Sequence, residues 1–144
     1  MKILIVDDEN LAISRLKRLL NENGIDDIVA FDNPMEALKE IVKTRFDAVF
    51  LDISMPNITG LELADSIMQI EPKTFIVFQT AYEEFALEAF QKGGIGYLVK
   101  PIQSEDIKTI LDCDQSTLSL LRFLSNLSLY SKISSALLFS IVPK

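Results

Sequence analysis

The chain has 144 residues, of which 49% are hydrophobic and 24% charged, proportions typical of one folded domain and not of a disordered chain. Its net charge of −7 argues against nonspecific binding to nucleic acid, because that affinity depends on basic side chains that meet phosphates. The lack of histidine excludes histidine-based acid–base chemistry and the usual zinc and haem sites, and the single cysteine, Cys113, excludes an internal disulfide.

Five short apolar runs recur at regular intervals and predict five buried strands. They cover residues 3–6, 28–31, 48–51, 75–78 and 96–99. Each run is continuous and does not alternate with polar residues, which is typical of parallel strands that are covered on both faces.

The stretches between these runs have the spacing of amphipathic helices. Asp32-Asn33-Pro34 and Ser104-Glu105-Asp106 predict the starts of the second and fifth helices, and Gly93-Gly94 predicts the end of the fourth. The five apolar stripes are formed by Leu11, Leu16, Leu19 and Leu20; by Ala37, Leu38 and Ile41; by Leu61, Ala64, Met68 and Ile67; by Phe85, Ala86, Ala89 and Phe90; and by Ile107, Ile110 and Leu111.

Strands that alternate with helices predict an α/β fold, a doubly wound five-stranded parallel sheet with right-handed crossovers and helices on both faces. In such open sheets, ligands bind beyond the carboxyl ends of the strands. Polar residues collect at these ends. Asp7 and Asp8 follow the first strand, and Asp52, Thr80 and Lys100 follow the third, fourth and fifth.

These polar residues predict a site for phosphoryl transfer. Neighbouring carboxylates repel one another, and a hard divalent cation such as Mg²⁺ relieves that repulsion through oxygen ligands. Asp52 would be both a ligand and a nucleophile, because a carboxylate can attack phosphorus to give an acyl phosphate. The Lys100 ammonium would neutralise charge, and the Thr80 hydroxyl would donate to a phosphoryl oxygen.

Each of these residues also has an ordinary structural explanation. Asp7-Asp8-Glu9 is a plausible helix N-terminus, and Asp52 is a possible cap for the helix that starts near Gly60. Thr80 alone suits a strand end, and Lys100 alone suits a solvated surface. The joint placement of all of them at one edge of one sheet favours a site.

Four motifs carry a resemblance to a known family. IVDDE (5–9), FLDISMPNITG (50–60), QTA (79–81) and YLVKPI (97–102) together resemble the receiver domain of two-component response regulators, over residues 1–112. The resemblance implies the flavodoxin-like strand order 2-1-3-4-5. Residues 81–102 are similar in particular to receivers that precede LytTR-type DNA-binding domains, although Gly94 and Gly96 replace the usual alanine and aspartate and are expected to loosen the segment.

The resemblance implies a role for each polar residue of the predicted site. Asp52 would accept a phosphoryl group from a sensor histidine kinase. Asp8, Asp52 and the backbone carbonyl of Ser54 would bind Mg²⁺, with Asp7 acting mostly through water. In this family the domain is a phosphoacceptor that assists its own phosphorylation and dephosphorylation, and it is not an enzyme in the usual sense.

The resemblance also implies a conformational switch. Thr80 and Lys100 would contact the phosphoryl group, and Tyr97 matches the aromatic residue that reorients when the threonine shifts. This change would alter the face built from helix four, strand five and helix five, where we expect homodimer formation.

Tyr82 and Ser54 flank the expected path of an attacking water, so a bulky Tyr82 is expected to slow hydrolysis of the acyl phosphate.

Two turns shape the predicted site. Pro56 restricts the loop after Asp52, and Gly60 is expected to permit the turn before the next helix. The Lys100–Pro101 bond is a candidate for the cis isomer, which makes a sharp turn.

The tail, residues 113–144, differs from the rest in composition. It is rich in leucine and serine and carries one acidic and three basic side chains, whereas residues 1–112 carry 20 acidic and 11 basic ones. Three hypotheses remain open for it: a C-terminal helix that packs on the receiver or a dimer partner, a remnant of a truncated output domain or of an altered reading frame, and a membrane-surface or partner-binding segment. Exposed apolar residues would cause self-association or aggregation.

Rival functions remain to be separated from this one. A magnesium-dependent phosphatase with an aspartyl nucleophile would carry a second aspartate two residues later, where this chain has Ser54. A flavin-binding protein would need a loop for phosphate after the first strand, and the acidic DDEN stretch (7–10) would repel that anion. A receiver that binds proteins without being phosphorylated is the third alternative.

No signal-peptide core or apolar run long enough to span a membrane occurs, so we expect a cytoplasmic protein.

Overall fold

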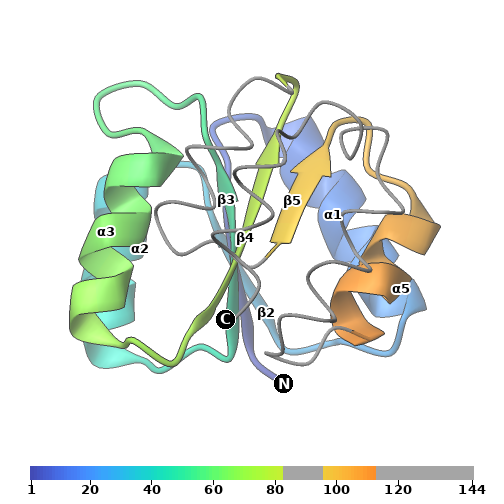
Figure 1. Ribbon diagram of the computed structural model, residues 1–144, viewed down its shortest axis with the longest axis horizontal. Coiled ribbons are helices and arrows are strands. Elements are labelled where there is room, and N and C mark those ends of the chain that lie inside the picture. The colour runs from blue at the N-terminus through green and yellow to red at the C-terminus, as the bar shows by residue number, and fades with distance from the viewer. Residues whose placement is uncertain (83–95, 113–144) are drawn as a thin grey trace, which may run out of the picture.

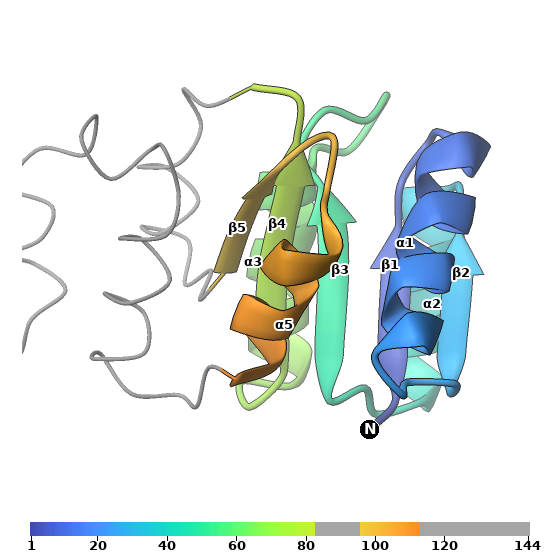
Figure 2. The ribbon, with the colours of Figure 1, turned by 90° about the vertical axis from the view of Figure 1, so that its right-hand side faces the viewer.

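The computed structural model describes residues 1–82 and 96–112. Its centre is one parallel sheet with the strand order β2-β1-β3-β4-β5. Figure 2 shows the five strands in this order, with their arrows pointing the same way. The predicted doubly wound sheet and its order are therefore confirmed. The strands are β1 (Ile3–Val6), β2 (Ile28–Phe31), β3 (Ala48–Asp52), β4 (Phe75–Thr80) and β5 (Gly96–Val99).

Helices cover both faces of the sheet, as Figure 1 shows. One face is covered by α2 (Pro34–Lys43) and α3 (Gly60–Ile70), and the other by α1 (Asn10–Glu22) and α5 (Ser104–Asp112). Four of the five predicted helices are thus confirmed. The predicted helix around 85–90, with its end at Gly93-Gly94, and the tail from Cys113 onward lie outside the described residues.

Two helices begin at residues whose side chains accept hydrogen bonds from N–H groups of the first helical turn. The Asn33 side chain accepts hydrogen bonds from the N–H groups of Met35 (2.8 Å) and Glu36 (3.4 Å), and Pro34 is the first residue of α2. The Thr59 side chain accepts from the N–H of Glu62 at 3.2 Å and caps α3. The predicted cap at Asn33 is confirmed.

The predicted apolar stripe of α1 is wrong at its first residue. Leu11 is 86% exposed, and the buried face is formed by Ile13, Leu16, Leu19 and Leu20. Leu11 precedes Leu16 by five residues, which turns its side chain about 140° away from that of Leu16. Ile13 precedes Leu16 by three residues and therefore lies on the same side as the core.

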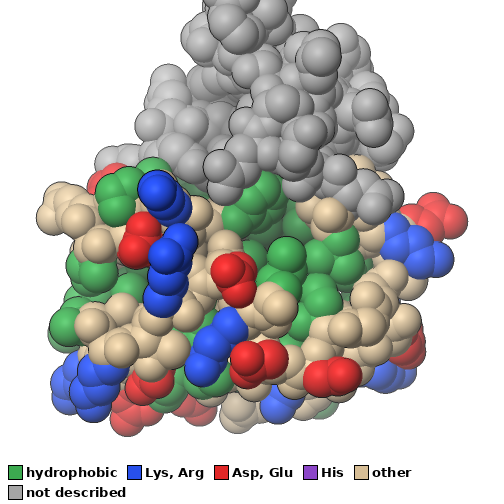
Figure 3. Space-filling view, turned by 90° about the horizontal axis from the view of Figure 1, so that it is seen from below, with side chains coloured by type: hydrophobic (Ala, Val, Ile, Leu, Met, Phe, Trp, Pro, Cys, Tyr) green, Lys and Arg blue, Asp and Glu red, His purple; other side chains and the backbone are tan. Residues whose placement is uncertain are grey.

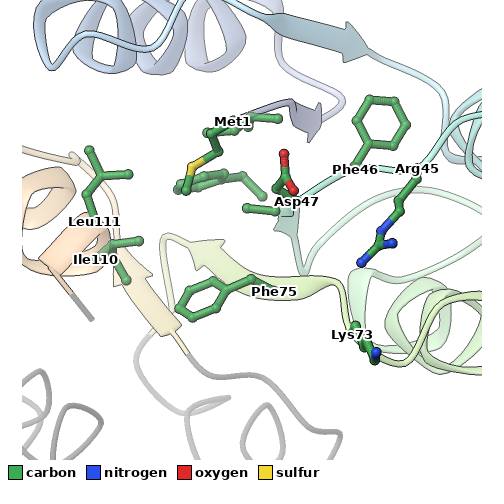
Figure 4. Close-up of a pocket in the computed structure, with 11 residues that line it drawn as sticks. Met1, Arg45, Phe46, Asp47, Lys73, Phe75, Ile110 and Leu111 are labelled. Atoms are coloured by element: carbon green, nitrogen blue, oxygen red, sulfur yellow. The ribbon is translucent and has the colours of Figure 1, made fainter. Parts of the chain in front are cut away.

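A cavity of about 480 Å³ opens at the amino edge of the sheet, where β1, β3 and β4 begin. Figure 3 shows this end of the molecule, where apolar side chains lie inside a border of charged ones. Figure 4 shows Met1, Phe75, Ile110 and Leu111 around the cavity, with Arg45 and Lys73 to one side. The cavity lies at the edge opposite to Asp7, Asp52 and Lys100, so it is separate from the predicted site.

Candidate functional site

Strand periodicity brings four polar side chains to the same face of the sheet. In a strand, residues two apart point to the same face of the sheet. This spacing relates four polar residues to apolar residues that face α1 and α5: Asp7, Asp52, Gln79 and Lys100. Asp52 pairs with Gln79, and Gln79 pairs with Leu98, two residues before Lys100. Side chains at paired positions of parallel strands point the same way, so one row of apolar side chains ends in a polar row at the carboxyl edge.

The structure brings the predicted carboxylates and the lysine into contact. Oxygen atoms of Asp7, Asp8 and Asp52 all lie within 4.8 Å of one another. Lys100 Nζ is 2.8 Å from Asp7 Oδ2 and 3.5 Å from Asp52 Oδ2. Asp7 and Asp52 are buried, whereas Asp8 is exposed at the mouth of the site.

The acidity of Asp52 shows the electrostatic cost of this arrangement. Burial, followed by repulsion from Asp7, raises the pKa of Asp52 to about 7, although Lys100 and the N–H of Ser54 oppose the shift. Burial lowers the pKa of Lys100, but its hydrogen bond to Asp7 and its attraction to Asp52 outweigh burial and leave that pKa raised. The lysine therefore stays charged, and it only partly compensates the carboxylates.

The residues of this cluster fit a hard divalent cation. Three carboxylates supply oxygen ligands within 4.8 Å of one another, and Asp7 and Asp52 are held together against the repulsion that raises the pKa of Asp52. Mg²⁺ prefers such oxygen ligands and needs only one or two carboxylates, because it retains waters. At Ser54 the observed contact is its N–H, which donates to Asp52 Oδ1 at 3.3 Å, so the role of its carbonyl remains a prediction.

Thr80 and Tyr97 are connected through the backbone of Tyr82. Thr80 is the last residue of β4, and its hydroxyl accepts from the N–H of Tyr82 at 3.2 Å. The hydroxyl of Tyr97 donates to the backbone carbonyl of Tyr82, and the Tyr97 side chain is fully buried. The N–H of Lys100 donates to the carbonyl of Thr80 at 2.8 Å. The predicted switch pair therefore lies in one hydrogen-bonded segment that also holds the lysine.

Gly60 is required for a different reason than the one predicted. A Cβ at this position would lie 2.2 Å from the backbone carbonyl oxygen of Asp52, a distance that no side chain can occupy. The left-handed backbone of the loop belongs instead to Asn57, with φ of 72°. The N–H of Gly60 donates to the carbonyl of Ile53 at 3.0 Å, so the start of α3 packs directly on the end of β3.

Thr80 does end a strand, as its ordinary explanation holds, but the ordinary explanations for the other single residues fail. Glu9 occupies the N-cap position of α1 without a side-chain hydrogen bond, while the Asp7 carboxylate accepts from the N–H of Glu9 at 2.9 Å and leaves the helix uncapped. Thr59, and not Asp52, caps α3. The Lys100 side chain is only 18% exposed and forms two ion pairs. The Lys100–Pro101 bond is cis.

Gly96 is tightly packed within β5, in contrast to the expected loosening of this segment. It pairs with Val77 of β4. A Cβ at Gly96 would lie 2.6 Å from Ile110 Cδ1, so the lack of a side chain lets α5 approach the sheet. Gly94 lies outside the described residues.

Comparison with known proteins identifies the family. Residues 3–112 match the family model of the response regulator receiver domain. The chain belongs to this family. The receiver domain is therefore a component of two-component signalling, with a histidine kinase as the implied partner.

Relatives of this receiver domain include LytTR-type regulators. It is 43% identical over 112 residues to the transcriptional regulatory protein YpdB of Escherichia coli, an alignment that covers 77% of this chain and 46% of YpdB. It is 42% identical over 108 residues to the sensory transduction protein LytR of Staphylococcus epidermidis, covering 74% of this chain and 43% of LytR. The chain thus spans less than half the length of these relatives.

A solved structure supports the same assignment. The receiver domain resembles the response regulator TrrA of Thermotoga maritima, solved in complex with Mg²⁺-BeF, with a TM-score of 0.70 and 36% identity; the alignment covers 77% of this chain and 96% of TrrA. Within residues 1–82 and 96–112, this receiver domain has no helix with the length and apolar character needed to cross a bilayer.

The roles of two residues in or near the polar row of the receiver domain were not predicted. Gln79 is buried and donates from Nε2 to Asp7 Oδ2 at 3.2 Å. Arg15 of α1 donates through Nε (3.2 Å) and a terminal nitrogen (3.1 Å) to the carbonyl of Ile102, just after the Lys100–Pro101 turn. A lone glutamine at the end of the apolar run FIVFQT (75–80) was a usable signal for Gln79. No local pattern indicates the partner of Arg15, which is 87 residues away.

Proposed function

We propose that Asp52 is the phosphoacceptor of this receiver domain and that a sensor histidine kinase supplies the phosphoryl group. The observation that carries this proposal is the contact of Lys100 with Asp7 and Asp52 inside a cluster of three carboxylates at the carboxyl edge of the sheet. This arrangement holds a carboxylate nucleophile beside a positive charge and beside ligands for a divalent ion.

The reaction follows from the groups present. A carboxylate oxygen of Asp52 attacks phosphorus, and the bond from phosphorus to the histidine nitrogen of the kinase breaks, its electron pair returning to the imidazole. Bound Mg²⁺ supplies positive charge that offsets the carboxylates and the phosphoryl oxygens. Asp8, Asp52 and the backbone carbonyl of Ser54 would hold it, with Asp7 acting through water. Lys100 binds a phosphoryl oxygen as a point charge, and the Thr80 hydroxyl donates a hydrogen bond to another phosphoryl oxygen.

Phosphorylation of Asp52 adds negative charge and acceptor oxygens, so it favours the conformation in which Thr80 and Lys100 bind that group best. Movement of Thr80 breaks or strengthens its contact with the N–H of Tyr82, whose carbonyl holds Tyr97. The response therefore spreads to the surface around β5 and α5, where a homodimer forms. This chain itself does not bind nucleic acid, and it acts in the cytoplasm.

The lifetime of the acyl phosphate depends on the residues around it. Tyr82 is 50% exposed and Ser54 is exposed, so both side chains are accessible to solvent. A large side chain at Tyr82 shields the acyl phosphate from water. The domain thus promotes its own phosphorylation and sets the rate of its own dephosphorylation.

Labelling with a small phosphodonor tests the acceptor. Wild-type protein incubated with radiolabelled acetyl phosphate and Mg²⁺ should incorporate an acid-stable, base-labile label, whereas Asp52→Asn should incorporate none. Asp47→Asn, at the opposite edge of the sheet, is the matched control and should be labelled like wild type. Undiminished labelling of Asp52→Asn would show that another residue is the acceptor, and turnover of a generic phosphate ester would favour a phosphatase.

A further inference from the structure

Gln79 is a buried polar residue that follows four apolar residues in β4. Its side chain is 1% exposed, and Nε2 donates to Asp7 Oδ2 at 3.2 Å. Gln79 pairs with Asp52 across β3 and β4, so its side chain lies beside that of the acceptor on the same face of the sheet. A buried amide here is costly unless it is hydrogen bonded, and its partner is the Asp7 carboxylate of the site.

The hydrogen bonds of Asp7 are divided unequally between its two oxygens. Among the described residues, Oδ1 accepts from the N–H of Glu9 at 2.9 Å, while Oδ2 accepts from Lys100 Nζ at 2.8 Å and from Gln79 Nε2 at 3.2 Å. Two donors at Oδ2 use both of its lone pairs. One of these donors is charged and mobile, and the other is neutral and fixed in a strand.

Lys100 cannot serve Asp7 and a phosphoryl group equally well. When the ammonium moves to a phosphoryl oxygen, as the proposed function requires, Asp7 loses its strongest partner. Gln79 and the N–H of Glu9 then remain, with one donor on each carboxylate oxygen. Two such contacts fix the orientation of the carboxylate plane, whereas one leaves it free to rotate.

A neutral donor suits this position better than the alternatives. An amide satisfies Oδ2 without adding a positive charge that would repel a divalent cation in the carboxylate cluster. An apolar side chain of the same length would leave a buried carboxylate oxygen unsatisfied once Lys100 has moved, which carries a large desolvation cost.

We propose that Gln79 is a positioning residue of the phosphoryl-transfer site, which holds Asp7 in its cation-binding orientation while Lys100 transfers to the phosphoryl group. This inference rests on the proposed function for the movement of Lys100. The role of Gln79 lies on one side of the sheet, and the predicted switch residues Thr80 and Tyr97 lie on the other side.

Titration calorimetry with Mg²⁺ alone tests the positioning role. Gln79→Met keeps the length of the side chain and removes the donor, and it should weaken Mg²⁺ binding by about tenfold, as is typical when a hydrogen-bond partner of the groups around a metal is lost. Thr74→Val is the matched control. Thr74 is buried just before the other end of β4, where its hydroxyl donates to the carbonyl of Phe46 at 3.2 Å. It should lose stability without changing Mg²⁺ affinity, and equal affinity of Gln79→Met and wild type would overturn the proposal.

Amide NMR of the wild-type protein supplies a second test that does not depend on a variant folding well. The side-chain amide pair of Gln79, identified by its absence from the spectrum of Gln79→Met or by sequential assignment, should exchange slowly with water both before and after addition of Mg²⁺ and beryllium fluoride. Exchange as fast as that of an exposed glutamine in either state would overturn the proposal.

The two tests separate this inference from the proposed function. A wild-type protein that binds Mg²⁺ but not the beryllium fluoride complex would count against the phosphoacceptor role of Asp52, while the comparison with Gln79→Met still decides the role of Gln79. Normal binding of both ligands by wild type and Gln79→Met alike would leave Asp52 as the acceptor and refute only the role of Gln79.

Discussion

Asp52 combines two requirements that oppose each other. Its position at the end of a buried strand fixes the carboxylate for the proposed attack on phosphorus, but burial and the neighbouring Asp7 raise its pKa to about 7. A protonated carboxyl group is a poor nucleophile and a poor cation ligand. A cation in the cluster would favour the ionised form, so metal binding and activation of the nucleophile are linked.

This linkage predicts a pH dependence of Mg²⁺ affinity. The pKa of Asp52 in the metal-free folded protein is raised from 3.8 to about 7, so below pH 7 a proton must leave before the cation binds. Affinity should therefore fall about tenfold for each pH unit below 7 and level off above it. Calorimetry across this range measures the dependence, with Mg²⁺ binding accompanied by proton release at pH 6 and by little release at pH 8.

Asp52→Asn provides the control for this dependence, because its amide does not titrate. It should bind Mg²⁺ more weakly at high pH and show a much flatter profile between pH 6 and 8. A profile for Asp52→Asn as steep as that of wild type would assign the proton to another group.

The contact between β3 and α3 explains why one glycine of the site loop has no substitute. A Cβ at Gly60 would overlap the carbonyl oxygen of Asp52, a backbone atom that cannot move without displacing the proposed acceptor. Gly24, after α1, has φ of +85° and open space around it, so alanine there meets conformational strain without a clash.

These two glycines give a comparative prediction for stability. Gly60→Ala should lower the free energy of unfolding by about 3 kcal/mol or more, because the clash involves backbone. Gly24→Ala should cost about 1 to 2 kcal/mol, the strain of a left-handed residue with a side chain. Urea denaturation of both variants measures the difference, and a milder effect at Gly60 than at Gly24 would contradict the contact described for Asp52.

The strands and most helices could be predicted because their signals are local. The apolar runs at 3–6 and 96–99 match β1 and β5 residue for residue, and Asn33-Pro34 marks the start of α2. The error at Leu11 arose because its five-residue distance from Leu16 fits no helical repeat. The requirement for Gly60 depends on a tertiary contact, which no spacing along the chain reveals.

The site was predictable as a set of strand ends but not as a network. Parallel strands present their carboxyl ends at one edge, which places Asp7, Asp52 and Lys100 together. Which oxygen accepts from which donor depends on side-chain geometry. Gln79 therefore gave only a weak signal, one polar residue in an apolar run, and its partner could not be inferred.

The polar row and the partly apolar cavity lie at opposite edges of the sheet. The polar row lies at the carboxyl edge of the sheet, and the cavity of about 480 Å³ lies at the amino edge, lined in part by Ile110 and Leu111 of α5. The charge is also uneven along the chain. Residues 1–112 carry 20 acidic and 11 basic side chains, whereas the remaining residues carry one and three.

This uneven composition leads to a prediction for association. The leucine-rich segment 113–144 should promote self-association, because exposed apolar side chains favour contacts between molecules. Sedimentation velocity over a range of concentrations should show larger species for the full chain than for a 1–112 truncation. Matching distributions for the two proteins at every concentration would exclude a role for this segment in association.

Gln79 and Thr80 are consecutive in β4, so their side chains project from opposite sides of the sheet. The carboxylates of Asp7 and Asp52 lie on the side of α1 and α5, whereas Thr80 follows Phe78, which pairs with Tyr97 on the opposite side. A single peptide unit thus joins the two halves of the domain. A displacement of Thr80 would accordingly be transmitted to Gln79, and to its contact with Asp7, through the peptide unit that the two residues share.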